Sequence, residues 1–429
     1  MKICIIGSGY VGLVSGACFS DLGNIVTCVD INKEIINNLN KGVIPIYEPG
    51  LQELVARNLQ KNRLFFSTDI SSSIINSDVI FICVGTPTKN NKADLKYVYK
   101  VIKSIKSNLN KYKVIVTKST VPVATGDKIE KILKSKKNKN KFDVVSNPEF
   151  LREGEAIRDF QFPDRVVVGT SSKKANKVMK NLYLPLIKKG GRYFHTSRRS
   201  AELIKYASNA FLATKITFIN EIANLCEKSN IDVKEISIGM GLDERIGSRF
   251  LRAGPSYGGS CFPKDTRALV TTGQSFHTNL SVVKSVIKSN DKRNNLLLNK
   301  VIKIMNNKIK NKNITFLGVT FKPGTDDIRE SPSLKMIPAL VKKGALISYY
   351  EPTGKKKIFK SKNITFYANI KDACKNSDLI IIHTEWNEFK QLNFKKITNK
   401  RIFKIFDMRN LYSPSDMKKN KISYFGIGR

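Results

Sequence analysis

The sequence predicts an α/β protein in which two Rossmann-like parallel-sheet domains are joined by a central helical domain. Three observations carry this prediction. Short β-rich runs alternate with helical patterns up to about residue 190, a helical stretch without proline or glycine begins near residue 200, and strand-like runs return from residue 313. A length of 429 residues favours two or three domains. The expected boundaries are 1–195, 196–300 and 301–429.

The first domain is expected to hold a parallel sheet with crossover helices. Its apolar runs each end in a turn residue or a polar cluster: KICIIG, IVTCVD, VIFICVG, VIVTKST and FDVVSNP. Residues 201–230 have helical periodicity and predict the long helix of the middle domain. The runs ITFLGV, LISYYE, LIIIHT and FKIFDM then predict a second, smaller α/β domain.

Cysteine and histidine usage bears on the cellular compartment and on metal binding. Seven cysteines are scattered without a CxxC pair, which fits a reduced, cytoplasmic compartment. Three histidines show no metal-ligand spacing, so we expect no metal site. The apolar runs are too short to span a bilayer, which predicts no membrane partner. The opening segment resembles a signal peptide, but its glycine-rich turn argues against one.

The net charge of +40 allows two interpretations. A basic surface is typical of nucleic-acid binding. However, the lysine- and asparagine-rich runs, such as 134–141 and 306–313, contain no aromatic residues and lie between apolar segments. We therefore interpret the charge as compositional bias and expect no specific nucleic-acid partner.

The segment GSGYVG follows the first predicted strand and opens a helical pattern. Gly7, Gly9 and Gly12 permit a tight turn and let a pyrophosphate approach the helix N-terminus. Asp30 ends the next strand, where a carboxylate binds the adenosine ribose and repels a 2′-phosphate. The sequence therefore predicts NAD rather than NADP, although an ordinary glycine turn in a βαβ unit would have a similar sequence.

Polar residues in later segments are weaker signals taken alone. Thr86 and Thr120 follow two further strands, where they face a ligand or simply cap a turn. Glu149 and Glu153 would share one face if their segment were helical, which could also be a solvated acidic face. Lys205 and Asn209 have the same spacing in the long predicted helix.

Taken together, the chain resembles the UDP-glucose 6-dehydrogenase family, within the UDP-glucose/GDP-mannose dehydrogenases. The resemblance covers nearly the whole chain and rests on seven motifs in order: GSGYVGLVSGACFSDLG, PIYEPGL, KSTVPVATG, NPEFLREGEAI, YASNAFLATKITFINEIANLC, GPSYGGSCFPKDTRAL and GVTFKPGTDDIRESPS. It implies an NAD-dependent, four-electron oxidation of UDP-glucose to UDP-glucuronate. The alternative is another nucleotide sugar, UDP-N-acetylmannosamine or GDP-mannose, although GGSCFPKD is more similar to the UDP-glucose branch.

The resemblance also implies that Cys261 is the nucleophile. Two hydride transfers oxidise the C6 alcohol, and the thiol adds to the intermediate aldehyde to give a thiohemiacetal and then a thioester. The implied catalytic residues are Cys261, Lys205, Asp265, Asn209, Glu149 and Thr120. The implied cofactor-binding residues are Gly7, Gly9, Tyr10, Val11, Gly12, Asp30, Lys33, Thr86, Thr120, Glu153, Lys264 and Arg329.

The remaining implied residues bind the nucleotide sugar. They are Glu149, Phe150, Leu151, Arg152, Lys205, Asn209, Arg245, Phe250, Leu251, Arg252, Ala253, Gly254, Gly258 and Lys322. Arg245 resembles the arginine that enters the site from a neighbouring subunit, so a homodimer or higher homo-oligomer is expected. One departure is Ile35, which stands near the position where many relatives carry a lysine for the adenosine ribose; Lys33 lies two residues earlier.

Overall fold

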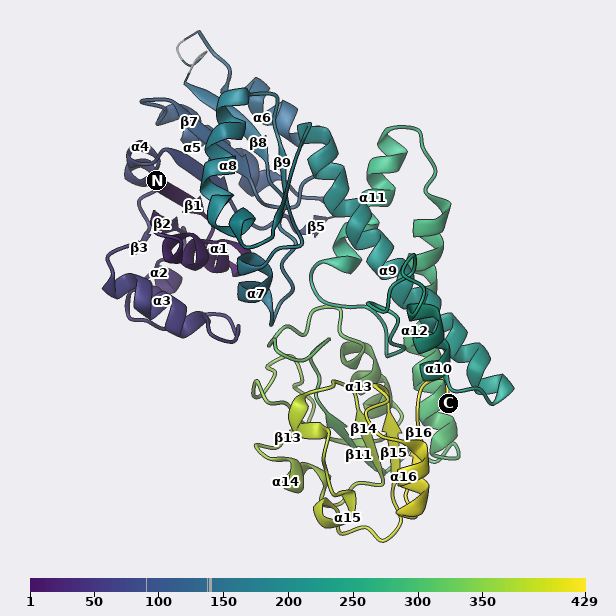
Figure 1. Cartoon of the computed structure of the whole chain (residues 1–429). Coiled ribbons are helices and arrows are strands. Elements are labelled where there is room, and N and C mark those ends of the chain that lie inside the picture. Colours follow the sequence, from purple (N-terminus) through teal and green to yellow (C-terminus); the bar gives the residue numbers. More distant parts are fainter. Residues whose placement is uncertain (90, 137, 139–140) are drawn as a thin grey trace. The chain divides into compact units, whose positions relative to one another are not determined.

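The computed structural model describes residues 1–89, 91–136, 138 and 141–429 (Figure 1). These residues form two compact units. Unit 1 comprises Met1–Ser208 with Arg267–Thr278, and unit 2 comprises Asn209–Thr266 with Asn279–Arg429. Of the lysine- and asparagine-rich run 134–141, residues 137, 139 and 140 lie outside the described residues.

Unit 1 contains a sheet of eight described strands. In spatial order they are β10 (Arg192–Thr196), β9 (Arg165–Gly169), β8 (Phe142–Ser146), β7 (Lys113–Thr117), β4 (Val79–Ile82), β1 (Lys2–Ile6), β2 (Ile25–Val29) and β3 (Leu64–Ser67). The strands from β8 to β3 are parallel, which confirms the expected sheet. β9 pairs antiparallel with β8, and β10 runs parallel to β9.

Both faces of this sheet are covered by helices, as a doubly wound fold requires. On the central strand β1, Ile3 and Ile5 belong to one core cluster, whereas Cys4 and Ile6 belong to another. The first cluster includes residues of α1 (Tyr10–Asp21), α2 (Lys33–Asn40), α3 (Leu51–Gln60), α7 (Ala156–Gln161) and α8 (Lys173–Lys188). The second includes residues of α4 (Ile70–Asn76), α5 (Lys96–Ser107) and α6 (Thr125–Leu133). Residues 3–6 of β1 form a continuous apolar run, as expected for a strand that is buried on both faces. A short hairpin of β5 (Thr88–Lys89) and β6 (Lys92–Ala93) follows β4.

Unit 2 contains a second, parallel sheet of six described strands. In spatial order they are β13 (Ile364–Phe366), β12 (Leu346–Tyr350), β11 (Asn313–Leu317), β14 (Leu379–Ile382), β15 (Lys404–Asp407) and β16 (Ser423–Phe425). One face packs on α12 (Ser281–Ile304) and α13 (Ser333–Lys342). The other packs on α14 (Ile370–Cys374), η1 (Asn387–Phe389), α15 (Phe394–Ile397) and α16 (Pro414–Lys419).

The long helix expected between the two sheets is α9 (Arg198–Ser229), which confirms the helical middle region. It ends just before Asn230, whose φ of +56° is a left-handed conformation that commonly terminates helices. This region also contains α10 (Val233–Gly241), α11 (Phe262–Ser275) and most of α12. Among the described helices, none has the length and apolar character needed to cross a membrane.

Candidate active site

The turn between β1 and α1 has the shape that a pyrophosphate requires. Gly7 has a φ of +104°, and a Cβ at that position would lie 2.9 Å from the carbonyl carbon of Cys83. A Cβ on Gly12 would collide with the carbonyl oxygen of Gly7. By contrast, a Cβ on Gly9 would meet no described atom within 4 Å. The turn therefore excludes side chains where it packs and leaves open space beside the helix N-terminus, which fits a dinucleotide.

Asp30 stands at the edge of this turn. Its Oδ2 accepts a hydrogen bond from the backbone N–H of Ser8 at 2.9 Å, and its Oδ1 accepts one from the backbone N–H of Asn32 at 3.0 Å. The residue is half-buried. Its carboxylate is thus fixed beside the glycine turn and keeps access to solvent, as a ribose contact needs. Lys33 is exposed at the start of α2.

Tyr10 is engaged with the protein through its side chain. Its hydroxyl donates to the carboxylate of Glu48 and accepts from the N–H of Gly154 at 2.9 Å. Glu48 is buried and also accepts from Gly154 at 2.6 Å and from Ala156 at 2.7 Å. Burial raises the pKa of Tyr10, and so does its hydrogen bond to Glu48. Sequence reasoning missed Glu48, although it lies in the PIYEPGL motif, because its backbone partners Gly154 and Ala156 are more than a hundred residues away.

A buried ion pair joins two of the predicted catalytic residues within unit 1. Lys205 Nζ lies 2.9 Å from Oε1 of Glu149, and the two side chains are only 4% and 6% exposed. Oε2 of Glu149 accepts from the N–H of Leu151 at 2.6 Å. Burial alone would raise the pKa of Glu149. The charge and hydrogen bond of Lys205, the Leu151 amide and the charge of Lys118 outweigh it, and they hold the pKa below its usual range. Glu149 is therefore ionised at neutral pH.

The segment around Glu149 is an irregular loop that precedes α7, so Glu149 and Glu153 do not share a helix face. The loop places the Phe150 ring 5.4 Å from Lys205 Nζ. Arg152, predicted to bind substrate, directs its guanidinium to carboxylates of the protein, with ion pairs of 2.6 Å to both Glu155 and Asp159.

Lys118 is a second buried cation that sequence reasoning did not single out. It lies in the KSTVPVATG motif and is 4% exposed. Its Nζ donates to the Tyr183 hydroxyl at 3.3 Å and to Oδ1 of Asn147 at 3.4 Å. Burial lowers its pKa. Together with Lys205 it makes the surroundings of Glu149 electropositive.

The structure brings Thr86 and Thr120 together. They follow the neighbouring strands β4 and β7, and Oγ1 of Thr86 donates to the backbone oxygen of Thr120 at 2.9 Å. Thr86 is buried and Thr120 is half-buried. This places both residues at the carboxyl edge of the sheet, where open α/β sheets bind ligands.

Glu202 of α9 holds the start of the helix that follows Thr120. Its Oε1 accepts from the N–H of Gly126 in α6 at 2.7 Å and from Oγ of Ser146 at 3.0 Å. Its Oε2 has no hydrogen-bond partner among the described residues, and the side chain is 3% exposed. Burial raises its pKa to about 6. Glu202 was not predicted, since its role depends on a packing contact between distant segments.

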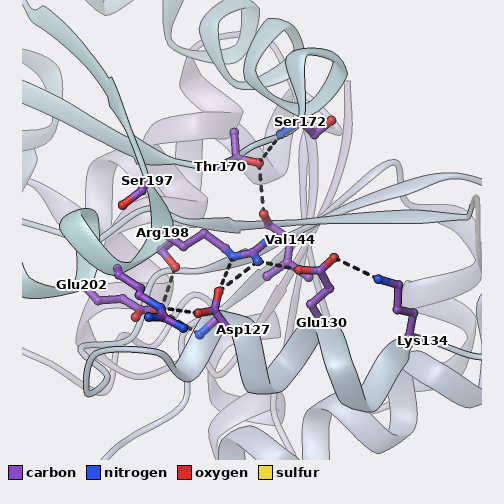
Figure 2. Close-up of polar contacts among 12 residues, drawn as sticks. Asp127, Glu130, Lys134, Val144, Thr170, Ser172, Ser197, Arg198 and Glu202 are labelled. Carbon is purple, nitrogen blue, oxygen red and sulfur yellow. Dashed lines mark hydrogen bonds and ion pairs between the residues drawn. The ribbon is translucent and has the colours of Figure 1, made fainter. Parts of the chain in front are cut away.

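Arg198 reinforces the same contact one turn earlier in α9. Figure 2 shows its guanidinium between two acidic residues of α6, Asp127 at 3.0 Å and Glu130 at 2.5 Å. Arg199 also pairs with Asp127, at 2.6 Å. α6 is thus anchored on the first turn of α9, the helix that carries Lys205.

Within unit 2, Asp265 connects three of the predicted catalytic or cofactor residues. It has no exposed surface, and its Oδ2 accepts from Nδ2 of Asn209 at 2.6 Å. Its Oδ1 accepts from Nζ of Lys264 at 2.5 Å. The N–H of Asp265 donates to the carbonyl oxygen of Cys261 at 2.8 Å, as expected for the first turn of α11. The predicted helical spacing is confirmed, because Asn209 lies four residues after Lys205 in α9.

Cys261 differs from the other cysteines of the described chain by being partly exposed. Its Sγ lies 3.5 Å from Oγ of Ser260. Burial raises the pKa of Cys83 and of Cys374 to about 12, which leaves their thiols protonated and unreactive. Accessibility therefore singles out Cys261 as the thiol that a substrate could reach.

The predicted substrate segment leads directly into this cysteine. Phe250 has a φ of +66° and is half-buried, Leu251, Ala253 and Gly254 are buried, and Arg252 is exposed. Gly258 packs so closely that a Cβ would lie 2.7 Å from the backbone oxygen of Glu330. The segment thus runs against the loop that follows β11.

That loop carries the two other predicted ligand residues of unit 2. Lys322 is half-buried, with its Nζ 5.7 Å from the ring of Phe321. Arg329 is exposed and forms an ion pair of 2.8 Å with Asp327. Arg245 lies elsewhere, after α10, with its side chain 89% exposed and paired with Asp243 at 2.6 Å.

Family models match three consecutive parts of the chain. The NAD binding domain of the UDP-glucose/GDP-mannose dehydrogenase family matches residues 1–187. The central domain of that family matches residues 199–292, and its UDP binding domain matches residues 315–414.

Individual relatives extend this similarity over the full length. The UDP-glucose 6-dehydrogenase of Rhizobium meliloti (strain 1021) is 47% identical, with 100% of both chains covered. The UDP-glucose 6-dehydrogenase TuaD of Bacillus subtilis (strain 168) is 45% identical, covering 100% of this chain and 93% of the relative. Among solved structures, a UDP-glucose dehydrogenase from the archaeon Pyrobaculum islandicum superposes with a TM-score of 0.91 at 32% identity, covering 99% of this chain and 97% of that chain.

Proposed function

Since the chain belongs to the UDP-glucose/GDP-mannose dehydrogenase family, an NAD-dependent group by its cofactor domain, we propose that it oxidises UDP-glucose to UDP-glucuronate. The main support for UDP-glucose as the substrate is the 47% identity over 435 residues to a relative named UDP-glucose 6-dehydrogenase. The proposed division of labour is cofactor binding in residues 1–195, helical packing in 196–300 and nucleotide binding in 301–429.

The proposed reaction removes two hydrides from one sugar carbon and consumes one water. NAD⁺, when bound, accepts each hydride. The first transfer turns the C6 alcohol into an aldehyde and releases a proton. Sγ of Cys261 then adds to the aldehyde carbon, giving a thiohemiacetal whose remaining hydrogen leaves as the second hydride. Water displaces the thiol from the resulting thioester, which releases the carboxylate and restores Cys261.

The buried charged groups have matching roles in this scheme. Lys205 stabilises the oxyanion that develops at C6, since a buried cation is far more effective there than one in water. Glu149, ionised and buried, accepts a proton from the attacking water, which Thr120 helps to orient. Asp265 and Asn209, joined by their hydrogen bond, polarise the reacting groups.

The remaining predicted residues serve binding. Gly7, Gly9, Gly12 and the backbone of Tyr10 and Val11 cradle the pyrophosphate of NAD, with Asp30 on the ribose. Further cofactor contacts are assigned to Lys33, Thr86, Glu153, Lys264 and Arg329. The nucleotide sugar is assigned to Phe150, Leu151, Arg152, Phe250, Leu251, Arg252, Ala253, Gly254, Gly258 and Lys322.

A homodimer completes the proposal. Phe211, Phe218 and Leu225 repeat every seven residues along α9 and are 65%, 47% and 60% exposed, which is typical of a helix face that packs against another chain. Arg245, highly exposed, is then available to reach the substrate of a second copy. We expect sedimentation analysis to show a dimer, and Phe218→Glu to produce monomers; a monomeric wild type would contradict this. A reduced cytoplasmic location suits the reactive role proposed for the Cys261 thiol.

The direct test measures NADH formation with three nucleotide sugars under identical conditions. We expect UDP-glucose to yield two NADH per sugar and to be used far better than UDP-N-acetylmannosamine or GDP-mannose. A preference for either of the others would assign this chain to a different substrate branch.

A further inference from the structure

Residues 251–259 form a largely buried segment without regular secondary structure, in which Arg252 is exposed. Leu251, Ala253 and Tyr257 are 2%, 7% and 5% exposed. Irregular segments usually run over the surface, because buried backbone N–H and C=O groups need hydrogen-bond partners. The partners of this segment therefore decide where it lies.

Two asparagines and one arginine provide them. The N–H of Gly254 donates to Oδ1 of Asn220 at 2.9 Å, and its carbonyl oxygen accepts from Nε of Arg293 at 2.8 Å. Four residues before Cys261, the N–H of Tyr257 donates to Oδ1 of Asn290 at 3.0 Å, and its carbonyl accepts from Nδ2 of the same asparagine at 3.2 Å. Both backbone groups of both residues are thus held by side chains from α9 and α12.

Arg293 also ties the two helices to each other. Its Nη1 donates to the backbone oxygen of Asn220 at 3.2 Å and to Oδ1 of Asn224 at 3.3 Å. The side chain is 4% exposed, and within the described residues its hydrogen bonds go to neutral oxygens rather than to a carboxylate. A buried cation without an ion pair is costly, so its presence indicates a requirement for the planar, multiply donating guanidinium.

The opposite side of the segment is closed as well. A Cβ on Gly258 would lie 2.7 Å from the backbone oxygen of Glu330, and the N–H of Gly259 donates to the backbone oxygen of Arg329 at 2.9 Å. The segment is therefore fixed from two directions, immediately before the cysteine.

We propose that Asn290 and Arg293 are positioning residues, which fix the backbone from Gly254 to Tyr257 and thereby set the substrate segment and the Cys261 thiol that follows it. This inference rests on the proposed function. The competing view is that the two side chains only satisfy buried backbone groups and contribute to folding. The two views differ in one expectation: whether a folded variant that lacks one of these side chains has altered kinetics and substrate binding.

The test compares Asn290→Ala with Asn295→Ala, a matched control at an exposed position of the same helix. For each we would measure kcat and KM for UDP-glucose, the affinity for UDP and for NAD⁺ by calorimetry, and the rate at which iodoacetamide alkylates Cys261. A misplacement of about 1 Å can cost roughly 100-fold in rate, so we expect Asn290→Ala to lower kcat/KM by about 10- to 100-fold. NAD⁺ affinity should not change, UDP should bind more weakly, and the alkylation rate should change; Asn295→Ala should match the wild type.

Two further variants keep the proposal testable if Asn290→Ala does not fold. Asn290→Asp keeps the oxygen that accepts from the Tyr257 N–H but loses the N–H donor to the Tyr257 carbonyl oxygen. Arg293→Lys keeps the positive charge but loses the planar guanidinium and its several N–H donors. If either variant folds and has the wild-type kcat, KM and alkylation rate, the proposed positioning role is wrong. An Asn290→Ala protein that differs from the wild type only in thermal stability would also contradict the proposal. If the wild type binds UDP but does not oxidise UDP-glucose, the proposed function is wrong. In that case the UDP affinities and alkylation rates of the variants still test the positioning role of Asn290 and Arg293.

Discussion

The two α/β domains share one local construction and use it differently. The first strand of each domain, β1 or β11, is followed directly by a glycine with positive φ, Gly7 at +104° and Gly318 at +78°. Each glycine donates its N–H to the last residue of the second strand, Val29 at 2.8 Å and Tyr350 at 2.9 Å. The next residue is acidic in both cases, namely Asp30 and Glu351. Both carboxylates accept backbone N–H groups from the glycine turn.

The difference lies in the segment that comes after each turn. α1 begins at Tyr10, three residues after its glycine, and presents its N-terminus at the turn. α13 begins only at Ser333, after a long loop, and no helix N-terminus lies at Gly318 among the described residues. Asp30 remains half-buried, whereas Glu351 is 1% exposed. We therefore expect the turn of the first domain to bind a ligand and the corresponding turn of the second domain to serve as a structural anchor.

Removing Glu351 should have the largest effect on stability. Its Oε2 accepts from Val319 at 2.8 Å and from Thr320 at 3.2 Å, and its Oε1 accepts from the Thr353 hydroxyl at 2.9 Å. Glu351→Ala leaves the buried N–H groups of Val319 and Thr320 unpaired and removes the partner of the half-buried Thr353 hydroxyl, which should cost on the order of 3 kcal/mol or more. Calorimetric thermal unfolding measures this loss of unfolding free energy, and Asp30→Ala serves as the comparison. If both variants lose the same small amount of unfolding free energy, Glu351 is not a structural anchor in a way that Asp30 is not.

Asp30 should instead control the choice of cofactor. The wild type should use NAD⁺ much better than NADP⁺, because the carboxylate repels a 2′-phosphate and bonds the ribose. Asp30→Asn should reduce that preference by about 1–3 kcal/mol, or roughly 5- to 150-fold in the ratio of kcat/KM values. Equal catalytic efficiency of the wild type with NAD⁺ and NADP⁺ would contradict the assignment of Asp30.

Glu202 and Glu351 are both buried carboxylates, but their hydrogen bonding differs. Within the described parts of the chain, Oε2 of Glu202 has no hydrogen-bond partner, whereas both carboxylate oxygens of Glu351 accept hydrogen bonds. Burial raises the pKa of Glu202 from 4.5 to about 6, so ionisation costs more in the folded state than in the unfolded one. Stability should therefore fall as pH rises from 4.5 to 6, by up to about 2 kcal/mol from this group. Glu202→Gln should flatten the pH dependence of thermal unfolding over that range. An unchanged slope would show that Glu202 is not the titrating group.

The sequence was sufficient for the parts of the fold that are locally encoded. β14 and residues 3–6 of β1 are unbroken apolar runs, and α9 is long and free of glycine and proline, so all three elements were predictable. β10, with the sequence RYFHT, was not predicted, because it is mostly exposed at the sheet edge and lacks an apolar run. β9 was missed as well, although its run RVVVG is apolar.

Residues of the candidate site were predictable only where they lie in a motif that resembles the family and has an assigned role there. Cys261, Lys205 and Glu149 were identified through segments that resemble a family. Glu48 and Asn290 were missed, because each acts on backbone groups of a segment far away in the sequence. No local pattern distinguishes such a residue from an ordinary polar side chain, since its role exists only once the chain has folded.

The most direct test of the account is Cys261→Ser, mixed with UDP-glucose and NAD⁺ and followed by NADH release and intact-protein mass. The side chain hardly changes in volume, so fold, NAD⁺ binding and UDP-glucose binding should survive. A serine hydroxyl is a poorer nucleophile and an ester hydrolyses less readily than a thioester, so steady turnover should fall by roughly 10³-fold or more, with any adduct forming slowly or persisting. Near-wild-type turnover with two NADH per sugar and no adduct would show that Cys261 is not the nucleophile.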